Sequence, residues 1–371
     1  MPIHEDEHPA ENLQLSEARM AQRRGRSENS QRSCETYRKN AGVELKMSHR
    51  IGYIDTAKGI CIMLVVAFHC NLHFSVTFDN MLGCIRMPLY YFLSGLFFKQ
   101  YEGYLPFIKR KVNKLLIPFF FFYLVTSVLL PNIFHTFFSY QINTVTGWAS
   151  LYAFIYPEVF PNIPIWFLWS LFCANILFYA LVLLGKKTSM SITYILAVII
   201  GITGFLLKWF SIDGIAFMNN TFYYFPFFIS GYIFNKFKQS HSIHFSKSTL
   251  LTISLLILIG FYLICSIETS DVWLSVIALY IACLSGISLI MILSSVVGTI
   301  PFVTYFGRYS IMILLTHCLV LQIFLKIFIL TGYSEPIVNL LTFISTMMSY
   351  LMFIPLMKKY LPYVTAQKEL L

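Results

Sequence analysis

The chain has 371 residues, of which 57% are hydrophobic and only 12% are charged, and its mean hydropathy is +0.68. A soluble domain carries about twice that charged fraction, so the composition excludes an ordinary globular enzyme and indicates a polytopic membrane protein. The net charge of +10 does not indicate nucleic-acid binding, because the excess of Lys and Arg falls in short segments between apolar runs.

The first part of the chain differs from the rest. Residues 1–46 are polar and lack apolar periodicity, which predicts a disordered extension. Met47 directly precedes the membrane-like sequence, so we expect it to be the native start and 1–46 to be an upstream extension. We expect residues 51–357 to form the membrane domain and 358–371 a short cytoplasmic tail.

Ten apolar runs follow, and each predicts one transmembrane helix of an all-α bundle. They are 56–78, 84–98, 115–131, 163–184, 190–207, 222–234, 248–267, 272–293, 305–330 and 337–357. With the N-terminus inside, the inner segments hold most Lys and Arg, and only Arg86, Lys208 and Lys326 fall on the outer side or in the outer half. This asymmetry predicts that both termini are cytoplasmic.

The first run contains an ionisable residue, His69, in its middle. Lys58 precedes it by eleven residues, about 1100° of rotation and roughly 16 Å of rise in a helix, so the two share one face. An imidazole inside a membrane is costly and normally faces a cavity, a pathway or a partner. His69 is therefore a candidate general base, with a packing hydrogen bond to a neighbouring helix as the alternative.

Two neighbours of this pair are also candidates. Asp55 begins the predicted helix, where its carboxylate can cap the first turn, pair with Lys58 at i, i+3, or take part in catalysis. His73 follows His69 at i, i+4, a spacing that could hold a metal, but we expect no metal, since no carboxylate or third ligand is predicted nearby on this helix.

Further cations stand at the ends of the next two runs. Arg86 lies near the predicted outer end of the second span, where it can snorkel to the interface or offer hydrogen-bond donors to a carbonyl or sugar oxygen. The third span is preceded by four cations in six residues: Lys109, Arg110, Lys111 and Lys114. They either report topology or bind the phosphates of a polyanionic cofactor.

Several stretches, in their order and spacing, resemble the integral-membrane acyltransferase 3 family over about 51–357. They are Lys58 with His69, Met87-Pro-Leu-Tyr-Tyr-Phe-Leu-Ser-Gly95, Lys111-x-x-Lys114-Leu-Leu-Ile-Pro118, Pro164-Ile-Trp-Phe-Leu-Trp-Ser-Leu-Phe172, Tyr224-Phe-Pro-Phe-Phe-Ile-Ser-Gly-Tyr232 and Gly307-Arg-Tyr-Ser-Ile-Met-Ile-Leu-Leu-Thr-His317. The opening Tyr53-Ile-Asp-Thr-Ala-Lys-Gly59 looks most like the branch labelled fucose 4-O-acetylase and related acetyltransferases.

The resemblance implies a ten-helix enzyme of a bacterial inner membrane. Such an enzyme takes an acyl group, usually acetyl, from cytoplasmic acyl-CoA and transfers it to a hydroxyl of a cell-surface polysaccharide or its lipid-linked precursor. The family pattern falls on Lys58 and His69 in the first span and on Lys111 and Lys114 before the third. Many relatives carry His before Met-Pro-Leu, where this chain has Arg86.

This function leads to specific expectations for the mechanism. His69 would accept the proton of the acceptor hydroxyl while Lys111, Lys114 and Arg110 hold the CoA phosphates. A cation from Lys58 or Arg86 would stabilise the developing oxyanion, and an acyl-His intermediate is the alternative to direct transfer.

Two residues of later spans complete the prediction. His317, in the ninth run, would orient His69 or contact the acceptor, unless it only forms a packing hydrogen bond. Trp166 would stack on the acceptor sugar, unless it belongs to an aromatic belt. The expected partners are acyl-CoA, a glycan or lipid-linked sugar and the bilayer, without metal or nucleic acid. The rival functions are a glycan or lipid transporter or flippase, and an inactive scaffold.

Overall fold

The computed structural model describes residues 52–371 apart from 102, 134–150, 154, 157–161, 213 and 241–244. The chain divides into two units, Met1–Ile51 and Gly52–Leu371, and the described residues belong to the second. The predicted extension 1–46 lies outside the described residues.

Every regular element in the described part of the chain is helical, as predicted for an all-α membrane bundle. In order they are α2 (Gly52–His69), α3 (Val76–Leu96), α4 (Tyr104–Lys111), α5 (Ile117–Phe122), α6 (Leu130–Ile133), α8 (Trp166–Lys187), α9 (Met190–Trp209), α10 (Met218–Ser240), α11 (Lys247–Cys265), α12 (Val272–Val297), α13 (Pro301–Arg308), α14 (Ser310–Ile329) and α15 (Glu335–Tyr360).

Within the described residues, eight helical segments are long and apolar enough to cross a membrane: Gly52–His69, Tyr104–Leu129, Ile163–Lys187, Met190–Trp209, Lys247–Cys265, Val272–Val297, Ser310–Ile329 and Glu335–Tyr360. Two more helices, α3 and α10, are 21 and 23 residues long but contain charged residues and an internal proline. Their lengths also suit a bilayer. The chain is therefore a multi-pass helical membrane protein, in agreement with about ten spans.

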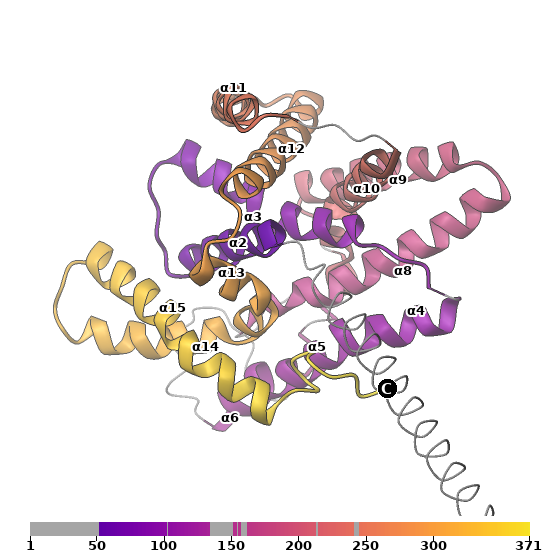
Figure 1. Cartoon of the computed structure of the whole chain (residues 1–371). Helices are drawn as coiled ribbons and strands as arrows, with labels where there is room; N and C mark the ends of the chain where they lie inside the picture. Colours follow the sequence, from indigo (N-terminus) through magenta and orange to yellow (C-terminus); the bar gives the residue numbers. More distant parts are fainter. Residues whose placement is uncertain are drawn as a thin grey trace, which may run out of the picture. The chain divides into compact units, whose positions relative to one another are not determined.

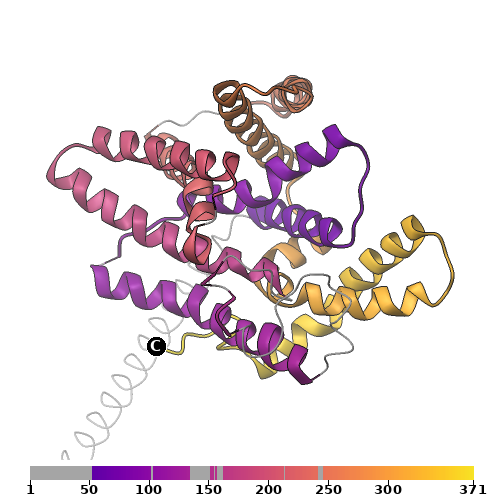
Figure 2. The same ribbon diagram turned by 180° about the vertical axis from the view of Figure 1, so that it is seen from behind.

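α2 lies among helices from both ends of the described chain (Figures 1 and 2). It contacts α3, α12, α13, α14 and α15. Two glycines allow the closest of these approaches: a side chain at Gly59 would meet the carbonyl of Val303, and one at Gly307 would meet the carbonyl of Asp55. Small residues at helix contacts let backbones approach closely in membranes. This contact brings the end of α13 to the first half of α2.

The first two spans begin and end earlier than predicted. Instead of 56–78 and 84–98, the helices cover Gly52–His69 and Val76–Leu96. Asn71 has a φ of 54°, which no helix can continue, and Ser75 caps the next helix by accepting a hydrogen bond from the Phe78 amide at 3.3 Å. The apolar residues between these two positions hide the turn from a hydropathy argument.

Two other predicted boundaries are also wrong. The basic segment predicted as part of the loop 99–114 is helical from Tyr104 and continues through π-helical turns at Val112–Leu116 and Tyr123–Leu129 to Ile133. The first π turn precedes Pro118, whose ring does not fit a regular α-helix. The predicted span 305–330 is two helices, α13 and α14, which are separated at Tyr309.

Candidate active site

Two cavities flank opposite halves of α2 and α3. One, which we call the lysine cavity, has a volume of about 330 Å³ and lies beside Lys58 in α2 and the second half of α3. The other, which we call the tyrosine cavity, has a volume of about 520 Å³ and lies beside Phe68 in α2 and the first half of α3. A histidine pair lies at the end of α2.

The lysine cavity gathers the predicted donor-binding cations around Lys58. Its charged lining residues are Lys58, Arg110, Lys111, Lys114 and Arg308, and no carboxylate occurs among the lining residues that the structure describes. Aromatic rings support two of the ammonium groups: the Lys58 Nζ lies 5.7 Å from the Phe97 ring and the Lys111 Nζ lies 5.5 Å from the Phe107 ring. Such a concentration of cations suits a polyanionic ligand.

Hydroxyl groups complete this lining. Tyr90, Ser94 and Ser310 face the same cavity, and the Tyr90 hydroxyl donates to the Lys58 carbonyl at 3.2 Å. Sequence reasoning missed these groups and Arg308 as site residues. In the sequence, the run around Arg308 and Ser310 indicates only a family resemblance, because its position beside Lys58 depends on the α13–α2 contact.

Arg110 differs from the other predicted donor-binding residues. Its guanidinium is exposed, lies 4.8 Å from the Tyr101 ring and pairs with Glu369 at 3.5 Å. Nearby, the Asn113 side-chain oxygen accepts hydrogen bonds from the backbone amides of residues 370 and 371 at 2.9 and 3.0 Å. The segment after α15 therefore contacts α4 and the π turn that follows it. The exposed ion pair between Arg110 and Glu369 contributes little to stability.

His69 is the last residue of α2, so the prediction that it lies in the middle of a span is wrong. Its ring lies 5.1 Å from that of His317 in α14. The His317 Nδ1 is 3.0 Å from the carbonyls of both Ile313 and Leu314. Because a carbonyl only accepts, Nδ1 carries the proton and Nε2 keeps its lone pair.

The second ring nitrogen of His317, Nε2, lies close to other atoms that could bind a metal. Its Nε2 lies 3.7 Å from the Cys318 Sγ, and one ligand atom each of His69, His317 and Cys318 lies within 4.8 Å of the others. Such a group could hold a soft cation, and sequence spacing could not reveal it because His69 is on another helix. The expectation of no metal stays a prediction.

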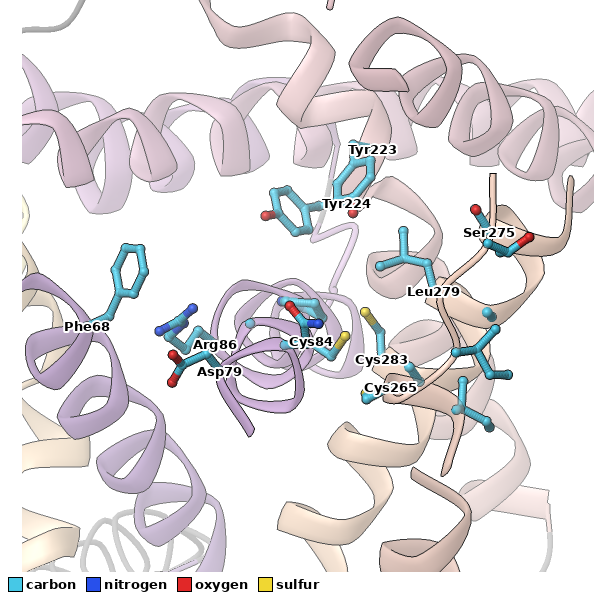
Figure 3. A pocket seen from close by; sticks show the side chains of 18 residues that line it. Phe68, Asp79, Cys84, Arg86, Tyr223, Tyr224, Cys265, Ser275, Leu279 and Cys283 are labelled. Carbon is cyan, nitrogen blue, oxygen red and sulfur yellow. The ribbon is translucent and has the colours of Figure 1, made fainter. Parts of the chain in front are cut away.

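The tyrosine cavity has a different chemistry (Figure 3). Tyr223 and Tyr224 of α10 lie across it from Phe68, with Arg86 and Asp79 on α3 between them. The Arg86 guanidinium lies 4.1 Å from the Phe68 ring, and the rings of Phe68 and His69 are 5.2 Å apart. His69 itself is not among the residues that line this cavity, and Arg86 lies in the middle of α3 instead of near its outer end.

Three further predicted residues, Trp166, His73 and Asp55, are not among the described residues that line the two cavities. Trp166 stacks on Tyr224 with ring centroids 6.1 Å apart, so it supports the tyrosine cavity from behind. The prediction that His73 shares a helix with His69 is wrong. His73 lies in the connection after α2, where its Nδ1 is 3.1 Å from the Asp79 carboxylate. Asp55 does not cap α2, which begins at Gly52, and its carboxylate lies 3.9 Å from the Lys58 ammonium.

The fold and the site define a multi-pass membrane protein with a cation-lined cavity, an aromatic cavity and a histidine pair at the end of their shared helix. Residues 51–357 match the acyltransferase 3 family, described as an acyltransferase domain, and the chain belongs to this family. It is a membrane acyltransferase. No curated protein and no solved structure matches the chain.

Proposed function

We propose that the protein transfers an acyl group, most simply acetyl, from acyl-CoA in the lysine cavity to a hydroxyl of a glycan or lipid-linked sugar in the tyrosine cavity. The observation that carries the proposal is the meeting of Lys58, Lys111 and Lys114 in one cavity without a described lining carboxylate. CoA is a polyanion with several phosphate groups, so cations on rigid helices suit it.

The choice of acceptor rests on the tyrosine cavity. Sugars offer hydroxyl groups and apolar ring faces, and the lining provides the aromatic rings of Tyr223 and Tyr224 as well as the oppositely charged Arg86 and Asp79. Few polar groups among aromatic walls are typical of specific small-molecule sites. The resemblance of Tyr53–Gly59 to the fucose 4-O-acetylase-like branch supports a sugar acceptor as well.

His69 is the proposed general base. The acceptor oxygen attacks the thioester carbonyl carbon as His69 removes its proton, the C–S bond breaks, and the proton passes to the departing CoA thiolate. His317 is the proposed positioning residue, because its ring lies 5.1 Å from that of His69 and is held in place by the carbonyls of Ile313 and Leu314. Lys58 or Arg86 would stabilise the oxyanion. An acyl-His69 intermediate is the two-step alternative.

The proposed setting is a bacterial inner membrane with both termini in the cytoplasm. The lysine cavity then opens toward the cytoplasmic donor and the tyrosine cavity toward the outer side. The loop and end cations support this orientation through the positive-inside rule.

The decisive experiment uses purified protein, radiolabelled acetyl-CoA and extracted glycan. Label should pass to the glycan with the wild type and with Ser270→Ala, an exposed control outside both cavities, and should be lost with His69→Ala. Full transfer by His69→Ala would remove the proposed base. Movement of glycan across a vesicle membrane without label transfer would favour the transporter or flippase instead.

A further inference from the structure

Three thiols meet on one wall of the tyrosine cavity. Cys84 comes from α3, Cys265 is the last residue of α11, and Cys283 lies in α12. Figure 3 shows the three side chains close together, on the side of the cavity away from Phe68. All three are free thiols, and the proposed acyl transfer uses none of them.

Cys84 is the shared neighbour in this group, since its thiol lies within hydrogen-bonding reach of both Cys265 and Cys283. Access separates these two candidates for a partner. Cys283 is only 2% exposed, whereas Cys84 and Cys265 are partly exposed. Thiol–disulfide exchange requires an attacking reagent to reach the sulfur, so a reagent in the cavity reaches Cys84 and Cys265 first.

The helix that ends at Cys265 lies at the edge of the bundle. Of the 19 residues of α11, only Ser254 and Phe261 are buried, and the helix contacts α12 and α3. Ile264 and Thr269, on either side of its end, also line the cavity. A covalent link from this end to α3 would restrain one rim of the tyrosine cavity.

We propose that Cys84 and Cys265 form a reversible disulfide that fastens the end of α11 to α3 and narrows the tyrosine cavity. The predicted topology puts this end of both helices on the outer side, where disulfides persist. The bond itself does not depend on acyl transfer. Its effect on acceptor binding rests on the proposed function.

The oxidant is a disulfide-bearing molecule or protein. One cysteine thiolate attacks a sulfur of the oxidant, which breaks the oxidant's S–S bond and forms a mixed disulfide. The second cysteine then attacks the protein sulfur of that mixed disulfide. One sulfur of the oxidant departs as a thiol in each step. In total two thiol protons and two electrons leave the protein, and the oxidant is reduced to two thiols, as when oxidised glutathione yields two molecules of glutathione.

The test measures the disulfide directly in the full chain. Protein in nanodiscs is treated with oxidised glutathione, the remaining thiols are alkylated, and the intact mass and peptide map are recorded. The wild type should lose two reactive thiols and yield one peptide pair that joins Cys84 to Cys265. Treatment with dithiothreitol should restore both thiols.

Matched serine variants assign the bond. Cys84→Ser and Cys265→Ser should prevent it, whereas Cys283→Ser and Cys173→Ser, a thiol in α8 outside both cavities, should leave it intact. Loss of the bond in Cys283→Ser but not in Cys265→Ser would overturn the assignment, and so would a wild type that keeps all its thiols. A thermal transition measured for each variant identifies one that does not fold.

A separate activity measurement tests whether the disulfide affects acceptor binding. If acyl transfer occurs, oxidation should lower kcat/KM for the acceptor but not the affinity for acetyl-CoA, and Cys265→Ser should be insensitive. An absent acyl transfer would contradict the proposed function and leave the peptide map to decide the disulfide.

Discussion

The lysine and tyrosine cavities border the same two helices yet differ in charge. The first holds five cations, Lys58 among them, together with hydroxyl groups, whereas the second holds the single cation Arg86, the carboxylate of Asp79 and two tyrosines. An excess of positive charge favours an anionic ligand, and one cation with one carboxylate among aromatic rings suits a neutral polar ligand. The contrast fits the proposal of two unlike substrates, one in each cavity.

The largest expected effect comes from His69, the proposed general base at the end of α2. His69→Ala should lower kcat about 10²- to 10⁴-fold, the usual contribution of a general base, with little change in the affinity for either substrate. Steady-state kinetics with both substrates varied will measure this. A kcat within the error of the Ser270→Ala control would contradict the assigned role.

The lysine cavity is tested by removing charge from it. Lys111→Ala with Lys114→Ala should weaken acetyl-CoA binding about 10- to 100-fold, because each charge-assisted hydrogen bond contributes about 1.5–3 kcal/mol before solvent screening. Calorimetric titration measures the affinity.

Lys186→Ala with Lys187→Ala provides the matched control. This exposed pair at the end of α8 carries the same charge but does not line the cavity. Equal weakening by both double variants would mean that overall charge, and not the cavity, attracts CoA.

The helix contact that completes the lysine cavity can be tested through stability. Gly307→Ala puts a methyl group against the Asp55 carbonyl, and such overpacking costs about 1–3 kcal/mol, so the thermal transition should fall. Gly260→Ala, where no atom lies within 4 Å of the new carbon, should be neutral or stabilising by up to about 1 kcal/mol. A Gly307→Ala protein as stable as Gly260→Ala would show that the α13–α2 contact is looser than described.

The smallest effect is expected in the tyrosine cavity. Tyr224→Phe removes one hydroxyl and keeps the ring, so KM for the acceptor should rise about 2- to 10-fold, equivalent to one hydrogen bond of about 0.5–1.5 kcal/mol. KM for acetyl-CoA should stay the same. Tyr262→Phe, at an exposed position on α11, is the control, and a change confined to KM for acetyl-CoA would reverse the assignment of the two cavities.

Much of the fold followed from local properties. Transmembrane helices were predicted from apolar runs, and the all-α class is confirmed. The errors occurred at boundaries, where the left-handed backbone of Asn71 and the π turn before Pro118 changed the course of the chain without changing its hydropathy. Such turns depend on single residues that a window of about 20 residues averages away.

The candidate site was predicted in part. Lys111 and Lys114 were expected to bind the phosphates of the acyl donor, and Lys58 was a candidate to stabilise the oxyanion. All three line one cavity. His73 was misplaced because the helix was assumed to continue beyond His69. Arg308 and Tyr224 were not singled out for the site, since an arginine at a helix end and a tyrosine in an aromatic run are common in any membrane protein.

The sequence by itself determined that this chain crosses a membrane repeatedly as helices and that Lys58 and His69 occupy one helix, because length, hydropathy and helical period are local properties. Only the tertiary structure decided that His69 meets His317 and that the cations of α4 and the following turn meet Arg308. These neighbours are far apart in the chain. Their meeting depends on close helix contacts, such as that of Gly307 with α2, whose partners no single stretch of sequence specifies.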